Sequence, residues 1–351
     1  MAQEALPERA ARLGRPMGGA GGAAPNAVVL LLPGGGAEHS GRRRSPVAAA
    51  ALLPLARRLV RAAQKTAGHG GGPGDGHPAP ALVAHLVHYR YRGWNGEAAH
   101  PAADAEWAVR ETVRRYGDVP VCLLGTGLGA RAALRAGGHP AVASVLALGP
   151  WLPKSRQQPE SSPDGAANSG STPESSPGSS PGTGAGPGAA AVPATEALAE
   201  RVAEPAGGSA DSAADDTGGG AVDGSGAGPE DGAGGRRAPD PSETEPVKHL
   251  TGRHVLLVHG TNDARTDPEQ SFRLAERIKK INPDVCRFEA HTDGHGLRQH
   301  HAEVAALAED FILGTLCGQD FARPLVDALA APPPLGLRMP LAVGFGRNLR
   351  K

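Results

Sequence analysis

The sequence is short of aromatic residues, of cysteine and of long apolar runs. Phe, Trp and Tyr make up 3% of the 351 residues. The most apolar run, 27–32, is far too short to span a bilayer. Cys122, Cys286 and Cys317 lie far apart and none has CxxC spacing. This pattern favours buried thiols in a reducing compartment over a disulfide framework, a metal site or a redox site.

Net charge is also missing. The chain carries 36 basic and 36 acidic residues, a formal net charge of zero, which gives no sign of a nucleic-acid partner. Residues 1–17 are charged and broken by proline, so they do not form the apolar segment of a secretion signal. We therefore expect a cytoplasmic protein with no membrane segment, no cofactor and no metal.

Glycine and proline, at 51 and 33 residues, gather in stretches that cannot form a packed core. We expect residues 1–25 to be disordered, 64–80 to be a flexible loop and 318–351 to be a loosely attached extension. The longest such stretch, 154–246, has 15 acidic and 5 basic residues and no aromatic residue. Too little apolar surface is present there to offset the conformational entropy lost on folding, which predicts a disordered acidic tract. Such a tract could bind a protein partner.

The rest of the chain alternates strand-like and helix-like segments. Apolar runs predict strands at 27–32, 82–89, 119–124, 142–148, 254–259 and 285–291. Helical patterns follow them at 45–60, from 100, at 130–136, from 268 and at 302–316. Such alternation predicts an α/β fold with a mostly parallel, doubly wound sheet in one domain over 26–317.

Two glycine-rich loops follow predicted strands. Pro33-Gly34-Gly35-Gly36 could bring backbone N–H groups close to a ligand, as an oxyanion hole requires, or it could be a flexible turn. Gly125-Thr126-Gly127-Leu128-Gly129 stands between a strand and a helix, which is the arrangement of a nucleophile elbow. Because ligands bind at the carboxyl ends of parallel strands, both loops belong to the expected site.

Two titratable residues follow the last predicted strands. Asp263 comes just after the fifth strand, where a carboxylate can hold an imidazole in the right tautomer. His295 stands on a turn after the sixth strand, and a lone histidine on a turn is usually just solvated. The chain order of elbow, acid and histidine, each at a strand end, favours a functional role for His295.

With these features the chain resembles the α/β-hydrolase superfamily, in particular its small bacterial members. The resemblance covers nearly all the residues expected to be ordered, and the 154–246 tract stands where the family places its variable cap insertion. It implies that Asp263 is the acid and His295 the base. It also implies that the oxyanion donors are the N–H groups of Leu128 and of one residue among Gly34, Gly35 and Gly36.

The chain departs from the family at the elbow, where Gly127 replaces the serine, aspartate or cysteine nucleophile. We therefore expect an esterase-like fold that is catalytically impaired and retains a pocket for a small molecule or an ester-like ligand. Two alternatives stay open. His295 and Asp263 could activate water to hydrolyse esters, amides or lactones. The protein could also be a scaffold that acts through 154–246.

The segment 89–96 holds two of the three tyrosines, one tryptophan and two arginines. Its aromatic residues, with Trp151, could brace a strand-to-loop corner, which we favour. Alternatively, the segment could wall the pocket and offer arginines to a carboxylate or phosphate.

Overall fold

The computed structural model describes residues 9–19, 24–35, 46–69, 81–152 and 245–346. Their centre is a sheet in which six consecutive neighbours are parallel: β4 (Leu82–His88), β3 (Ala27–Leu32), β5 (Val121–Thr126), β6 (Val142–Leu148), β7 (His254–Gly260) and β8 (Val285–Ala290). All six correspond to predicted strands. Two short strands, β1 (Arg12–Leu13) and β2 (Met17–Gly18), pair antiparallel with β4, and β9 (Met339–Pro340) pairs parallel with β8.

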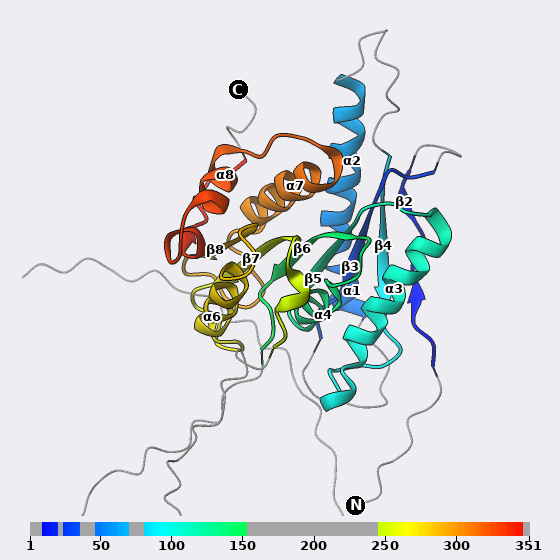
Figure 1. The fold of residues 1–351 in the computed structure, drawn as a ribbon, viewed down its shortest axis with the longest axis horizontal. Helices are drawn as coiled ribbons and strands as arrows, with labels where there is room; N and C mark the ends of the chain where they lie inside the picture. Colours follow the sequence, from blue (N-terminus) through cyan, green and yellow to red (C-terminus); the bar gives the residue numbers. More distant parts are fainter. Residues whose placement is uncertain (1–8, 20–23, 36–45, 70–80, 153–244, 347–351) are drawn as a thin grey trace, which may run out of the picture. The chain divides into compact units, whose positions relative to one another are not determined.

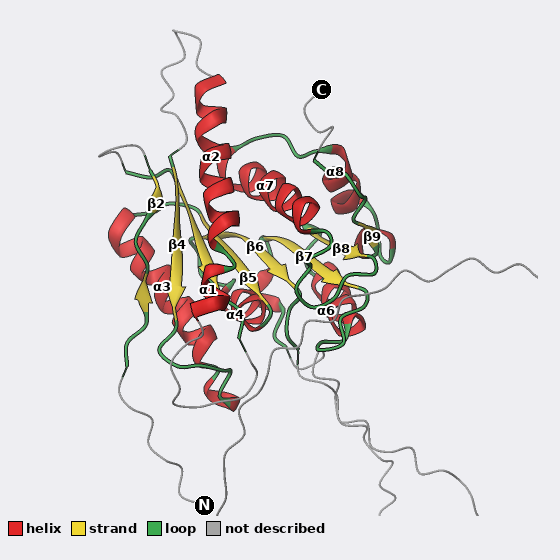
Figure 2. Cartoon of the chain, turned by 180° about the vertical axis from the view of Figure 1, so that it is seen from behind, coloured by secondary structure: helices red, strands yellow, loops and turns green. Residues whose placement is uncertain are grey.

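Helices cover both faces of the sheet (Figure 1). One face packs against α2 (Leu53–His69), α7 (His301–Cys317) and α8 (Arg323–Ala330). The other packs against α3 (His100–Tyr116), α4 (Leu128–Ala136) and α6 (Pro268–Lys279). Figure 2 shows the same layers from behind.

The sequence of β3 explains why two layers of helices are needed. Val28, Leu30 and Leu32 belong to one core, and the alternate residues of the strand belong to the other. Successive residues of a strand point to opposite faces of the sheet, and all six side chains of β3 are buried. A continuous apolar run therefore requires a cover on each side of the sheet.

The strand order is that of an α/β-hydrolase sheet: β3 lies between β4 and β5, and the chain then proceeds outward through β6, β7 and β8. The predicted fold class is confirmed. The cap position, between β6 and β7, corresponds to residues 153–244, which lie outside the described residues, as does most of the expected acidic tract.

Three segments differ from what composition led us to expect. Residues 64–69 extend α2, so the predicted loop begins later than residue 64. Within 1–25, β1 and β2 pair with the exposed edge of β4, which supplies the hydrogen bonds that their sequence does not predict. Within 318–351, α8 and β9 pack on the body, where Leu325 and Leu337 are fully buried.

The helix predicted at 45–60 is divided. Helix α1 (Pro46–Ala50) ends before α2, and Pro54 stands in the first turn of α2, where its missing N–H costs nothing. The segment expected as one helix therefore forms two.

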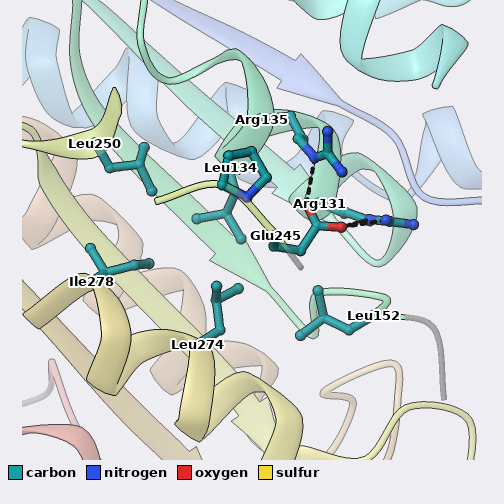
Figure 3. Close-up of a pocket in the computed structure, with 9 residues that line it drawn as sticks. Arg131, Leu134, Arg135, Leu152, Glu245, Leu250, Leu274 and Ile278 are labelled. Carbon is teal, nitrogen blue, oxygen red and sulfur yellow. Dashed lines mark hydrogen bonds and ion pairs between the residues drawn. The ribbon is translucent and has the colours of Figure 1, made fainter. Parts of the chain in front are cut away.

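A buried cluster of charges holds the chain where it re-enters the body at residue 245. Glu245 pairs with Arg131 and Arg135 of α4, and Nε of Arg131 lies 2.6 Å from the Glu245 carboxylate (Figure 3). The backbone oxygen of Glu245 accepts a hydrogen bond from Arg277 at 2.9 Å. Leu152, the last described residue before the cap position, lines the same small cavity as Glu245.

The three cysteines are unpaired, and Cys122 and Cys286 are buried. Burial raises the pKa of the Cys122 thiol to about 12, as expected for a small core side chain. Across the described ranges, no helix has the length and apolarity needed to span a membrane.

Candidate functional site

The turn from β5 into α4 forms the centre of the candidate site. Gly127 lies directly between the two elements with φ +53° and ψ −115°, a backbone conformation that only glycine adopts without strain. A side chain on Gly125 would collide with the carbonyl of Gly129, so strand and helix can approach closely only with glycine there. The predicted strand, sharp turn and helix are present.

Gly127 faces the ring of His295. A Cβ built on Gly127 would lie 3.4 Å from Nε2 and 3.7 Å from Cε1 of His295, and 3.9 Å from the α-carbon of Gly34. A hydroxyl on that Cβ would therefore be within hydrogen-bond reach of Nε2. The topology brings together three segments that are far apart in sequence.

Asp263 holds the other side of the His295 ring. Its Oδ2 lies 2.9 Å from Nδ1 of His295, and the carboxylate is fully buried while the His295 side chain is 28% exposed. Because an ionised carboxylate only accepts, Nδ1 carries a proton, and in the neutral form of the ring Nε2 is the acceptor that faces Gly127. Among the described residues, Nε2 has no hydrogen-bond partner.

The Asp263 carboxylate accepts four further hydrogen bonds. Oδ2 accepts from Oγ1 of Thr266 at 2.6 Å and from Nε2 of His259 at 3.2 Å; Oδ1 accepts from the backbone N–H groups of Arg265 and Thr266. Burial works to raise the pKa of Asp263, but the bonds from His259, Thr266 and His295 outweigh it and hold the pKa well below its usual range. Asp263 is therefore ionised near neutral pH.

A buried polar chain continues behind Asp263. Nδ1 of His259 lies 2.8 Å from Oγ of Ser271, and Ser271 accepts from Nε of Arg287 at 3.0 Å. Burial lowers the pKa of His259, and Arg287 lowers it further, so the ring is neutral and donates through Nε2 to Asp263. Arg287 also pairs with Glu289 at 2.6 Å.

The turn that carries His295 is fixed by a second buried aspartate. Oδ1 of Asp293 accepts from the N–H groups of Gly294 and Arg298 at 2.9 and 3.0 Å, and Oδ2 accepts from the N–H of His300 at 3.0 Å. These bonds position His295 without involving its ring.

The glycine loop after β3 lies beside Gly127. The N–H of Gly34 donates to Oγ1 of Thr126 at 2.9 Å, so this group is already engaged. Gly35 is exposed, and Gly36 lies outside the described residues. Leu128 begins α4 immediately after Gly127, with its side chain buried.

Sequence reasoning found the residues that meet at the site but missed the groups behind them. Thr266, Ser271 and Arg287 had no recognisable motif, and His259, which begins the run that ends at Asp263, was given no role. One signal was available: Arg287 and Glu289 alternate with apolar residues in a strand whose other positions are all buried. Charged residues at such positions are expected to pair.

A cavity of about 760 Å³ adjoins the site at the carboxyl ends of β3 and β4. Its lining includes Gly34, Gly35 and Leu128, together with Tyr89 and Tyr91. By contrast, Trp94 and Trp151 pack near each other, with the guanidinium of Arg131 3.9 Å from the centre of the Trp94 ring. In this segment the tyrosines line a cavity, whereas Trp94 packs against Arg131 of α4 and lies near Trp151.

Across the described ranges, no three His, Cys, Asp or Glu side chains are grouped so that they could hold a metal ion. No protein-family profile matches the chain, and no curated protein matches it by sequence.

Solved structures with a similar arrangement are hydrolases. Butyrate-bound esterase 2 of Thermogutta terrifontis is 16% identical, with 88% of this chain and 91% of that chain covered and a TM-score of 0.43. Esterase Pf2001 of Pyrococcus furiosus is 10% identical, with 83% and 84% covered and a TM-score of 0.42. XC6422 of Xanthomonas campestris, described as an α/β serine hydrolase without a lid, is 8% identical, with 90% and 100% covered and a TM-score of 0.42. The fold class rests on the strand order given above.

Proposed function

We propose that this chain is an esterase-like α/β hydrolase in which Gly127 occupies the nucleophile position, so that catalysis is impaired while a small-molecule pocket is kept. The observation that carries the proposal is the position of His295: its acceptor Nε2 lies 3.4 Å from where the Cβ of a nucleophile would stand. Asp263 acts as the acid that orients the ring, and His295 as the base.

The oxyanion donors of the proposed site are backbone groups. Leu128 supplies the N–H that follows the nucleophile position, as in other elbows. Of the glycine loop, Gly34 uses its N–H to bind Thr126, which leaves Gly35 as the donor among the described residues. The charge that develops on a tetrahedral intermediate would be stabilised between these two groups.

The proposal is tested by restoring the hydroxyl. Hydrolysis of 4-nitrophenyl acetate and butyrate is measured for the native protein, Gly127→Ser, and Gly127→Ser combined with His295→Ala. We expect Gly127→Ser to exceed the native rate by at least about 10²-fold, the contribution of a positioned base, and the double variant to lose that gain. Gly252→Ser serves as the control, because Gly252 also has a positive φ, +73°, and none of the site residues described above is among its near neighbours.

A folded Gly127→Ser protein that gains no His295-dependent turnover would rule the proposal out.

A second candidate follows from the free acceptor on His295. Nε2 has no partner on the described residues and Gly127 leaves space in front of it, so His295 and Asp263 could activate a water for attack on an ester, amide or lactone. If this route operates, the native protein turns over the substrate, and His295→Ala abolishes that turnover. The scaffold alternative depends on 154–246, which lies almost entirely outside the described residues, and it stays a prediction, as does the cytoplasmic location.

A further inference from the structure

The cavity beside the candidate site is lined by four arginines. Arg9 and Arg12 come from the N-terminal segment that pairs with β4, and Arg90 and Arg92 come from the loop that follows β4. Among the described residues that line this cavity, none is aspartate or glutamate. Two stretches of chain that are far apart in sequence therefore place positive charge around one hollow.

Only one of these charges is neutralised within the described residues. Nε of Arg90 pairs with Asp104 at 2.5 Å, and the backbone N–H of Arg90 donates to the same carboxylate at 2.8 Å. Asp104 is fully buried, so it holds Arg90 in place from behind. Arg9, Arg12 and Arg92 form no ion pair with any described residue.

A buried hydroxyl at the same cavity also lacks a partner. Tyr89 lines the cavity and is 6% exposed, yet its Oη has no hydrogen-bond partner. Burial raises the pKa of Tyr89, so the hydroxyl keeps its proton and is a donor. Because this oxygen is itself buried, it is not part of the anion site, which the arginines form.

The cavity adjoins the candidate reaction centre through two residues next to Gly127. Gly34, whose α-carbon lies 3.9 Å from the Cβ position of Gly127, and Leu128 both line it. Its volume of about 760 Å³ falls in the range of small-molecule sites. A molecule seated there would lie between the arginines and Gly34, the loop residue beside Gly127.

We infer that the site takes a small anionic molecule, with a carboxylate or phosphate bound by Arg9, Arg12 and Arg92 and a carbonyl group directed to Gly127. Guanidinium groups bind both oxyanions through paired N–H donors. The placement of the carbonyl end rests on the proposed function, whereas the binding of the anion does not.

Binding is tested on the native full-length protein by isothermal titration. The probes are glutarate, butyl phosphate and the uncharged glutaramide. We expect at least one anion to bind about tenfold or more tightly than glutaramide, and its affinity to fall with added salt. Whichever of glutarate and butyl phosphate binds more tightly identifies the oxyanion.

Variants assign the binding to the cavity. Arg12→Gln and Arg92→Gln are each expected to weaken binding of the anion by about tenfold. Arg323→Gln, on an arginine that is 92% exposed on α8, removes the same charge elsewhere and should leave affinity unchanged. Equal affinity for glutarate, butyl phosphate and glutaramide overturns the inference, as does equal weakening by Arg92→Gln and Arg323→Gln.

A turnover experiment distinguishes a failure of this inference from a failure of the proposed function. In Gly127→Ser, 4-nitrophenyl hydrogen glutarate is compared with its uncharged methyl ester, and kcat/KM should favour the anion. If Gly127→Ser has no turnover but the native protein still binds anions through Arg92, the hydrolase proposal fails and the anion site stands. If Gly127→Ser hydrolyses both esters equally well, the hydrolase proposal stands and the anion site fails.

Discussion

Gly127 and His295 face each other across a gap that a single side chain would fill. The nearest atom to a Cβ on Gly127 is Nε2 of His295, at 3.4 Å, which is ordinary van der Waals contact. If a side chain at residue 127 lowers the stability of the fold, the loss therefore comes from the backbone conformation. If it adds catalytic activity, the gain comes from the His295 ring opposite.

Gly127→Ala is expected to destabilise the fold by about 1–3 kcal/mol, because alanine is strained at φ +53°. Gly252→Ala should cost a similar amount, since Gly252 has φ +73° and open space around its Cβ position. Urea denaturation of the two variants provides the comparison. If Gly127→Ala costs much more than Gly252→Ala, steric contact with His295 is larger than the distance implies.

His259→Phe is expected to cost about 1–3 kcal/mol, because Asp263 and Ser271 each lose a buried hydrogen-bond partner. In the Gly127→Ser background the same change should lower kcat more than it raises KM, since His259 acts on substrate only through Asp263. A stability loss with no change in kcat would show that His259 is purely structural.

Acid should weaken the fold in two stages. Burial lowers the pKa of His259 in the folded protein, so its contribution is complete above the unfolded pKa of about 6.5 and declines as pH falls below it. The low pKa of Asp263 adds stability that is present above about pH 3.9 and is lost on further acidification. Unfolding free energies measured between about pH 7 and pH 5 should fall less steeply in His259→Phe than in the native protein.

Glu245→Gln is expected to destabilise the protein by about 3–5 kcal/mol, because it leaves Arg131 buried without its counter-charge. Glu106→Gln is the matched control: Glu106 pairs with Arg110 at 3.8 Å on an exposed face of α3, and its loss should cost less than about 1 kcal/mol. Equal effects in thermal denaturation would mean that the Glu245 cluster does not hold the body together.

The sequence predicted the sheet well because its strands are buried on both faces, so apolar runs such as Ala27–Leu32 stand out from their surroundings. It predicted the meeting of Gly127, Asp263 and His295 because parallel strands end at one edge of the sheet. It could not predict β1, whose two residues become a strand only when β4 offers hydrogen bonds. Likewise, Glu245 gives no local sign that its partners stand more than a hundred residues earlier in α4.

Leu152 and Glu245, the described residues on either side of 153–244, line one small cavity. The two ends of the intervening stretch are therefore held close together by the packing of Leu152 and Glu245. The entropy of closing such a loop grows only with the logarithm of its length, by about 0.6 kcal/mol for each doubling. A change in the number of residues between Leu152 and Glu245 therefore alters this closure entropy only slightly.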